Sequence, residues 1–340
     1  MDEQKQTSVA MPELLTVSPS PHAKREVTTA RLMGDVLIAL LPATIWGFVA
    51  FGLRAVLVVL TSVIFSVFFE FLTQKLLHRP VTVRDLSAAV TGLLLGLNLS
   101  PAVPIYIPIV ASAFAIIVVK QLFGGIGMNV MNPALAARVF VMLAWPGIMS
   151  IFPAAFDFSS VLPDVVASAT PLASLKAGAI PAGYSVLDLF LGRTPGCIGE
   201  VSALMLLIGG VYLIWRRVIS WHIPVSFLGT VALLTFLFPR GDASRLDFML
   251  ASLFSGGLMI AAIFMATDYV TSPVTKAGRL IYGVGCGLIA VFIRYFGGYP
   301  EGASFAVLIM NTLVWYLDMA TKPRVYGKSR REKKGGRANG

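Results

Sequence analysis

Two short stretches, LNLSP at residues 97–101 and YVTSP at residues 269–273, each close an apolar run with a serine–proline pair. Phe-Gly-Gly follows the serine of the first stretch after 23 residues and that of the second after 24. Two motifs that recur at nearly the same spacing indicate an internal repeat. Proline cannot donate a backbone hydrogen bond and disfavours a helical residue before it. We therefore expect the helix in front of each stretch to stop short or break.

The composition predicts an integral membrane protein. Hydrophobic residues make up 56% of the 340 residues and charged residues only 13%, and the mean hydropathy is +0.81. So few charges could not cover the surface of a water-soluble domain. The apolar runs are near twenty residues long, which suits helices that cross a hydrocarbon layer of ~30 Å. They lack the alternation expected of an outer-membrane barrel.

We expect an all-α polytopic protein with about ten transmembrane helices. The predicted spans are 35–53, 55–73, 86–100, 104–122, 132–149, 201–215, 220–238, 248–266, 280–294 and 303–320. The third and eighth spans take the same place in two five-helix repeats, 35–149 and 201–320. Because five is odd, the second repeat enters the membrane upside down, as in urea and ammonium channels. Residues 1–34, 150–200 and 321–340 form an N-terminal segment, a loop and a basic tail.

The basic residues predict the orientation. With the N-terminus inside, the cytoplasmic side collects 21 of the 27 lysines and arginines. Basic residues are enriched on the cytoplasmic side of membrane proteins, so both termini are predicted to be cytoplasmic and the 150–200 loop to lie outside. The net charge of +10 then indicates contact with membrane lipid rather than with nucleic acid.

The segment KQLFGGIGMNVMNPA, residues 120–134, places Asn129 and Asn132 just before Pro133, where a helix is predicted to begin. Helix N-termini present unpaired N–H groups and a positive dipole end. The asparagines therefore either cap this helix or help to bind an anionic or strongly polar ligand. Both readings stay open at the sequence level, and Asn132 is one candidate cofactor-binding residue.

Two carboxylates stand near predicted span ends. Glu200, in GCIGEVS at residues 196–202, is at the entrance to the sixth span, where the helix dipole favours a negative charge. It is a second candidate cofactor-binding residue. Asp268 lies beside the predicted break of the eighth span. Charges at membrane depth are costly and are functional candidates by default, so we assign Asp268 to a candidate ion path. The scattered histidines and two cysteines predict no metal site.

The stretch DVVASATPLASLK, residues 164–176, is a polar and turn-rich part of the predicted outer loop. Thr170 is followed by proline and has small neighbours, which would leave its hydroxyl accessible on an extended backbone. Such a hydroxyl suits covalent modification by an enzyme. On these residues alone, an ordinary exposed threonine is the simpler interpretation.

Motifs along nearly the whole chain resemble one family. This family contains the D subunit of the Rnf electron-transport complex and the B subunit of the sodium-pumping NADH:quinone reductase. The motifs that carry the resemblance are SPH at 20–22, KQLFGGIGMNVMNPA at 120–134, ASATP at 167–171, GCIGEVS at 196–202, MATDYVTSP at 265–273 and EGASFAVLIMN at 301–311. Only about 34 residues precede the first predicted span, whereas the quinone-reductase branch carries a longer N-terminal extension. The Rnf branch is therefore favoured.

The resemblance implies a covalent flavin. In this family a flavin transferase joins FMN through a phosphoester to a threonine, and the matching residue here is Thr170. The transferase pattern resembles Asp-x-x-Ser/Thr-Gly-Ala-Thr, which Asp164, Ala169 and Thr170 match. Ala167 and Ser168 depart from it, because alanine replaces a hydroxyl residue and serine replaces glycine. Asp164 and Ser168 are accordingly weaker candidates for the flavin site than Thr170.

The resemblance also implies an activity and partners. Electrons would pass from ferredoxin to NAD through cofactors in several subunits, coupled to translocation of Na⁺ or H⁺ across the bacterial cytoplasmic membrane. This chain would be one flavoprotein subunit without a complete active site of its own. Its partners would be the other Rnf subunits, including the G subunit with its covalent FMN, and the flavin transferase. A noncovalent riboflavin is a further expected cofactor. The alternatives are a flavin-free permease or channel, a structural subunit without cofactor, and the quinone-reductase B subunit.

Overall fold

The computed structural model describes residues 28–156, 171–178, 184–200, 202–241, 244–298 and 301–323. Within these ranges the chain forms helices and turns and no strand, which confirms an all-α protein. Asp164, Ser168 and Thr170, the residues predicted to carry the flavin motif, lie outside the described residues.

Every predicted span coincides with helical residues. The N-terminal elements are α1 (Thr29–Leu76), η1 (Val83–Asp85), α2 (Ser87–Leu97), α3 (Tyr106–Ala113), the π-helix η2 (Phe114–Gln121), α4 (Pro133–Ala144) and α5 (Pro146–Met149). Two short helices follow, α6 (Pro171–Lys176) and α7 (Val186–Leu191). The C-terminal elements are α8 (Ala203–Trp215), α9 (His222–Leu237), α10 (Arg245–Phe254), α11 (Leu258–Ile260), the π-helix η3 (Ala261–Met265), α12 (Lys276–Phe296) and α13 (Ala303–Thr321).

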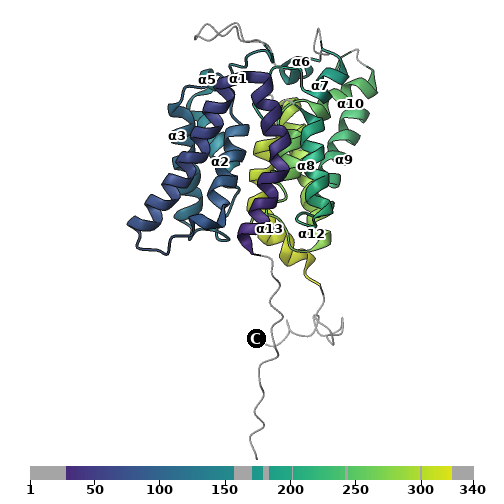
Figure 1. Ribbon diagram of the computed structural model, residues 1–340. Coiled ribbons are helices and arrows are strands. Elements are labelled where there is room, and N and C mark those ends of the chain that lie inside the picture. The colour runs from purple at the N-terminus through teal and green to yellow at the C-terminus, as the bar shows by residue number, and fades with distance from the viewer. Residues whose placement is uncertain are drawn as a thin grey trace, which may run out of the picture.

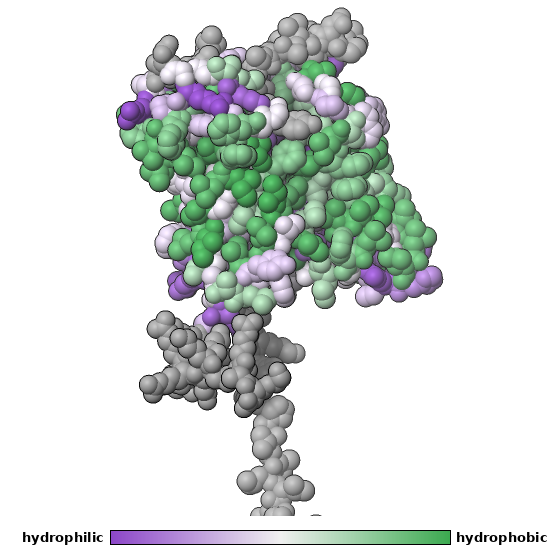
Figure 2. Space-filling model, turned by 180° about the vertical axis from the view of Figure 1, so that it is seen from behind, coloured by the Kyte–Doolittle hydropathy of each residue, from purple (hydrophilic) through white to green (hydrophobic). Residues whose placement is uncertain are grey.

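Several of these helices are suited to cross a membrane. Among the described residues, α1, α12 and α13 are long and apolar enough by length and composition, and the bent segment from α10 to η3 adds a fourth. On the face that Figure 2 shows, hydrophobic residues form a broad band across the middle of the molecule, and hydrophilic residues gather at its two ends. This distribution matches the apolar interior and polar surfaces of a bilayer. The chain is therefore a multi-pass membrane protein.

A break at Gly52 turns α1 into two arms. A straight helix of 48 residues would be ~72 Å long, more than twice the thickness of the hydrocarbon layer. Gly52 has φ 66° and ψ −150°, a conformation that glycine adopts without the steric cost of a side chain. The chain reverses direction at this point (Figure 1). The two arms correspond to the first and second predicted spans.

The helix before LNLSP stops short, as predicted, because α2 ends at Leu97. The eighth span, predicted over residues 248–266 to stop short or break beside Asp268, ends at Met265 and has a further break near its start. It begins at Arg245 and bends by 66° between α10 and α11. Gly256, with φ 69°, lies in the bend. No proline lies within the bend, so the serine–proline pattern could not predict where it occurs.

Arg294 of α12 holds the bend. Its Nη1 donates to the Ser252 carbonyl at 2.6 Å and its Nη2 to the Ser255 carbonyl at 3.1 Å. Carbonyls at the end of a helix lose their intrahelical partners and are costly to leave unpaired inside a membrane protein. The buried guanidinium therefore replaces the hydrogen bonds that the bend removes.

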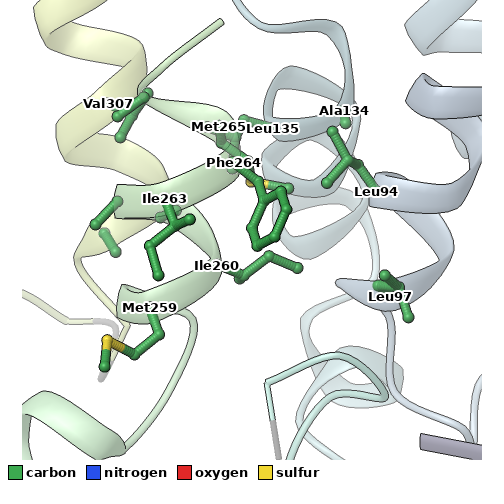
Figure 3. Close-up of a cluster of buried hydrophobic side chains, with 14 of the residues drawn as sticks. Leu94, Leu97, Ala134, Leu135, Met259, Ile260, Ile263, Phe264, Met265 and Val307 are labelled. Atoms are coloured by element: carbon green, nitrogen blue, oxygen red, sulfur yellow. The ribbon is translucent and has the colours of Figure 1, made fainter. Parts of the chain in front are cut away.

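The segment from α11 to η3 lies at the centre of the bundle. Figure 3 shows its side chains between α13 on one side and α2 and α4 on the other. Ile260 and Phe264 are buried there together with Leu94 and Leu97 of α2. Burial on every side explains why the segment is apolar throughout, from Leu258 to Ala266. The bend at the start of this segment therefore lies in the interior of the protein.

The two ends of the bundle differ in what they carry. The start of α1 and the end of α13 lie at one end, and α5, α6 and α7 lie at the other (Figure 1). Lys120, Arg138 and Arg294 are buried, so they report on internal pairing and not on membrane orientation. The remaining basic residues keep the same bias between the two sides.

Close helix packing gives a stability prediction. A Cβ on Gly209 of α8 would lie 2.1 Å from the Ala39 carbonyl oxygen of α1, whereas a Cβ on Gly229 of α9 would meet no atom within 4 Å. We expect Gly209→Ala to lower the free energy of unfolding by about 1–3 kcal/mol through overpacking. Gly229→Ala should leave it unchanged or raise it by up to ~1 kcal/mol through helix propensity. Thermal unfolding in detergent measures both, and equal midpoints for the two variants would contradict this packing.

Candidate functional site

A guanidinium lies between two carboxylates inside the bundle. Arg138 Nη1 is 2.5 Å from Glu200 Oε1, and Arg138 Nη2 is 2.5 Å from Glu301 Oε2. Nη1 also donates to Asn98 Oδ1, and Nη2 contacts Cys197 Sγ at 3.3 Å. We call these five residues the Arg138 cluster. They come from the C-terminal cap of α2, from α4, from the α7–α8 connection and from the residues just before α13.

The Arg138 cluster is buried and charged. The side chains of Arg138, Glu200 and Glu301 are 3%, 6% and 13% exposed. Arg138 pairs with both carboxylates, and the buried Arg294 nearby interacts electrostatically with both as well. Charges are costly away from water unless they are paired. Glu200 lies outside the membrane-spanning helices, and burial raises the pKa of its carboxyl, while Arg138 acts in the opposite direction.

Backbone pairing positions Glu200. The Gly199 N–H donates to the Leu97 carbonyl at 2.7 Å and the Ile198 N–H to the Leu99 carbonyl at 3.1 Å. The GCIGEVS segment thereby satisfies carbonyls at the end of α2, which the short helix leaves free. Helix α8 begins only at Ala203. The sequence suggested that Glu200 lies at the start of this helix, but the residue precedes the first helical turn. Its charge is paired with Arg138 and not with the helix dipole.

A glycine makes room for both carboxylates. A Cβ on Gly257, in the bend before α11, would lie 2.5 Å from Glu200 Oε1 and 2.9 Å from Glu301 Oε1. These distances are far below normal contact, and the obstructing atoms belong to buried side chains with fixed partners. Only glycine leaves space for the two carboxylates at this position. The bend and the Arg138 cluster therefore depend on each other.

A small cavity of about 70 Å³ adjoins the Arg138 cluster. Arg138, Glu200 and Glu301 line it together with Ser255 of the bend and Pro171. Pro171 is the first residue of α6 and directly follows Thr170 in the sequence. The structure thus places the chain next to Thr170 beside the buried charges.

Helix α6 is fixed to the rest of the bundle. Leu172 and Leu175 are buried, and Leu175 packs in a cluster with Phe248 of α10. Lys176 Nζ donates to the Gly297 carbonyl at 2.5 Å and to the Gly298 carbonyl at 3.1 Å, at the end of α12. The sequence predicted an exposed loop here. The described part of this loop instead contains a short helix that is anchored by apolar burial and by a lysine on free helix-end carbonyls.

A second, larger cavity of about 420 Å³ contains two of the predicted site residues, Asn132 and Asp268. Its lining is mostly apolar, with polar groups from η2, α2, the 127–132 segment and the residues after η3. Asn132 accepts from the N–H groups of Ala134 and Leu135 at 3.0 and 3.3 Å. Its own amide donates to the Met265 carbonyl at 3.3 Å. Asn132 is therefore the N-cap of α4 as well as a wall of the large cavity.

Charged groups of opposite sign line the large cavity. Lys120 Nζ is 2.8 Å from Glu70 Oε1 and donates to Ser87 Oγ at 2.6 Å. Asp268 follows η3 and accepts from Thr271 Oγ1 at 3.3 Å. Burial raises the pKa of the Asp268 carboxyl, which is partly offset by hydrogen bonds from neighbouring residues. The lysine has its own carboxylate partner, so Asp268 has no direct ion pair within the described residues.

The predicted site residues thus fall into two places. Asn132 and Asp268 share the large cavity, and Glu200 belongs to the Arg138 cluster. Sequence reasoning did not single out Glu301, although it begins the EGASFAVLIMN motif. Glu301 could have been found from its position, because it is a carboxylate just before a predicted apolar span, as Glu200 is.

Comparisons with known proteins agree on one family. A family model described as "NQR2, RnfD, RnfE family" matches residues 16–327. A protein of Acetobacterium woodii, named as the D subunit of a Na(+)-translocating ferredoxin:NAD(+) oxidoreductase complex, is 48% identical over 94% of this chain and 97% of its own length. The D subunit of a proton-translocating ferredoxin:NAD(+) oxidoreductase complex of Clostridium ljungdahlii is 38% identical over 93% and 97%. The D subunit of an ion-translocating oxidoreductase complex of Stutzerimonas stutzeri is 38% identical over 89% and 93%.

The Arg138 cluster gives a direct stability prediction. Arg138→Met would leave two buried carboxylates without their cation, so we expect the free energy of unfolding to fall by about 3–5 kcal/mol. Arg193→Met is the control, because Arg193 is exposed, and should change it by less than ~0.5 kcal/mol. Thermal or denaturant unfolding of the purified variants measures the difference. An Arg138→Met protein as stable as the control would show that the cluster does not hold the fold together.

Proposed function

Because the chain belongs to the NQR2, RnfD, RnfE family, we propose that it is a membrane flavoprotein subunit of an ion-translocating ferredoxin:NAD oxidoreductase. Catalysis in such a complex is shared among subunits, as the names of the relatives indicate. In this proposal the chain carries electrons through an FMN joined by a phosphoester to Thr170. Bound FMN supplies the redox chemistry, and the protein supplies its position and its electrostatic surroundings.

The anchored helix that follows Thr170 is the observation that carries the proposal. A tether limits a flavin to the neighbourhood of its attachment point, and Pro171, the residue that follows Thr170 in the sequence, lines the small cavity beside the Arg138 cluster. Two residues that line the small cavity each have a buried polar atom without a hydrogen-bond partner among the described residues, namely Arg138 Nε and Ser255 Oγ. The surroundings of Pro171 therefore offer unused hydrogen-bonding capacity, as a site for a polar group requires.

The large cavity supports riboflavin as a second, noncovalent cofactor. Its volume of about 420 Å³ is within the usual range for small-molecule sites, which are mostly apolar with a few polar groups. Lys120 is paired with Glu70, and Asn132 already caps the N-terminus of α4. These pairings leave neither Lys120 nor the start of α4 free to bind a phosphate. An uncharged flavin suits this lining better than FMN.

The proposal includes an orientation and a set of partners. Both termini would be in the cytoplasm of a bacterial cell, with Thr170 on the outer side of the cytoplasmic membrane. The position of α6 opposite the described chain ends supports this arrangement (Figure 1). The order of long and broken helices supports ten spans arranged as an inverted five-plus-five repeat. The partners would be the other Rnf subunits, including the G subunit, and the flavin transferase that modifies Thr170.

Thr170→Ala should abolish covalent flavin. We expect the wild-type chain, produced together with its flavin transferase, to give a fluorescent band on a denaturing gel, and the variant to give none. Ser174→Ala is the matched control, because it removes a nearby hydroxyl of α6 and should keep the band. Riboflavin released by acid precipitation should be present in all three proteins, since its proposed cavity lies elsewhere.

Two results would contradict these assignments. A band that persists in Thr170→Ala would place the phosphoester on another residue. A wild-type protein without covalent or released flavin would favour the flavin-free permease that the sequence left open.

Asp268→Asn should impair ion transport more than flavin content. The substitution keeps the shape of the side chain but removes the negative charge beside the large cavity. We expect ferredoxin-driven Na⁺ or H⁺ uptake into vesicles to fall at least about tenfold, corresponding to ~1.4 kcal/mol or more, with covalent FMN unchanged. Asp247→Asn, at the exposed start of α10, is the control. Unchanged uptake would remove Asp268 from the ion path.

A further inference from the structure

We propose that a pocket at the turn between α8 and α9 binds the phosphate headgroup of an anionic phospholipid. This third cavity has a volume of about 420 Å³ and contains two arginines, Arg217 of the turn and Arg279 near the start of α12. We call it the basic pocket. The inference goes beyond the proposed function, because it concerns a ligand that takes no part in electron transfer.

The basic pocket carries positive charge that no carboxylate neutralises. Among the described residues, no aspartate or glutamate lines it, and neither Arg217 nor Arg279 forms an ion pair. Asp35 of α1 accepts from Arg216 instead, at 3.2 and 3.3 Å. Asp268 lines the large cavity and not this pocket. Two guanidinium groups without carboxylate partners favour an anionic ligand such as a phosphate.

A backbone contact holds Arg279 in place. Its Nε donates to the Pro273 carbonyl at 2.9 Å, and its side chain is partly buried. This hydrogen bond restricts the guanidinium and leaves its two Nη groups for a ligand. A planar guanidinium that is already held loses less side-chain entropy when it binds phosphate oxygens.

Arg217 occupies a backbone position that favours glycine. It follows Arg216, the cap residue of α8, and has φ 57°. Its N–H donates to the Ile214 carbonyl at 3.0 Å, and the Val218 N–H donates to the Leu213 carbonyl at 2.9 Å. This is the Schellman pattern, which glycine usually completes. A side chain in the left-handed region has a steric cost. The helix dipole also favours a basic residue here, but Arg216 supplies one without that cost. An arginine at this position therefore indicates a role for the side chain beyond the fold.

The basic pocket lies at the level of the membrane surface. Arg216 pairs with Asp35 near the start of α1, at the end of the bundle that also carries the end of α13 (Figure 1). Two tryptophans beside the turn, Trp215 and Trp221, are 78% and 52% exposed. Tryptophan is enriched where a membrane meets water. The phosphate groups that are abundant at this level belong to phospholipid headgroups.

The helices beside the basic pocket provide an apolar surface for acyl chains. Helix α8 packs on α1, and α9 packs on α12 and α10, so these two consecutive helices make few contacts with each other. Ile214 and Trp221 line the pocket and are exposed. Val211 of α8 and Val225 of α9 are exposed about one turn farther along the same helix faces. A phospholipid could contact this surface with its acyl chains, whereas free phosphate could not.

The start of α9 adds to the positive potential of the basic pocket. Trp221 and Ile223, at the start of this helix, line the pocket, and no side chain among the described residues caps it. Unpaired N–H groups at a helix start favour negative charge. This contribution would not make a site by itself, but it has the same sign as the two arginines. In the proposed orientation the pocket faces the cytoplasmic leaflet, whose anionic lipids bind basic pockets between helices. Only the choice of leaflet rests on that orientation.

Lipid binding by the full-length protein in detergent tests the proposal. Native mass spectrometry would compare dioleoylphosphatidylglycerol with dioleoylphosphatidylcholine, which has the same acyl chains and no net charge. We expect phosphatidylglycerol to bind the wild type more tightly. Arg217→Gly and Arg279→Gln should each weaken its binding by about fivefold or more, as expected for one basic residue at an anionic surface. Arg84→Gln removes an exposed basic residue outside the pocket and should leave both affinities unchanged.

Thermal unfolding separates lipid binding from a structural role of Arg217. Without lipid, Arg217→Gly should keep or raise the unfolding midpoint, because glycine adopts the left-handed conformation without strain. His78→Gly is the matched control, since His78 follows the cap residue of α1 with φ 52° and lies outside the pocket. Phosphatidylglycerol should raise the midpoints of the wild type and His78→Gly more than that of Arg217→Gly, because a ligand stabilises the folded state that binds it.

Three results would overturn the proposal. Equal affinity of the wild type for the two lipids, or full phosphatidylglycerol affinity in both arginine variants, would exclude a headgroup site in this pocket. Inorganic phosphate that binds as tightly as phosphatidylglycerol would indicate a site for a free anion. An Arg217→Gly midpoint well below that of His78→Gly would assign the Arg217 side chain to the fold. These measurements require no flavin, so their failure would leave the proposed function standing.

Discussion

The contact of Arg138 with Glu200 and Glu301 is the interaction on which the rest of the structure depends. It joins α4 of the N-terminal half to the segments that lead into α8 and α13 of the C-terminal half. The same guanidinium reaches Asn98 at the end of α2. A buried pair of this kind is weak evidence for added stability, but the loss of one partner is severe. Arg138 therefore determines the relative position of the two halves more than it adds to the free energy of unfolding.

The membrane explains why the irregular segments lie where they do. Inside a bilayer, non-helical backbone is tolerated only where protein or a cavity satisfies its polar groups. The short end of α2 is paired with the GCIGEVS segment, and the bend before α11 is capped by Arg294. Between these two irregular places lies the buried α11–η3 segment (Figure 3). The large cavity lies beyond its η3 end, and the small cavity lies at its α11 end.

Sequence patterns predicted the helical segments well, because apolar runs of near-membrane length leave few alternatives. They also predicted that α2 stops before Pro101, and capping of α4 by Asn132 was one of the two interpretations that they left open. They missed the bend at Gly256, since the Ser-Gly-Gly stretch at residues 255–257 does not by itself reveal the φ angle of its glycines. The pairing of Arg138 with Glu301 bridges 163 residues, and local patterns carry no information about such contacts.

A cryo-electron microscopy map of the intact complex tests the central claim most directly, namely that this chain holds FMN on Thr170 beside the Arg138 cluster. Our account predicts continuous density from Thr170 Oγ into a phosphate and a flavin ring, on the side of the bundle that carries α6. It also predicts that Arg138 contacts both Glu200 and Glu301 in that map. An unmodified Thr170, or a flavin attached elsewhere on the chain, would contradict it.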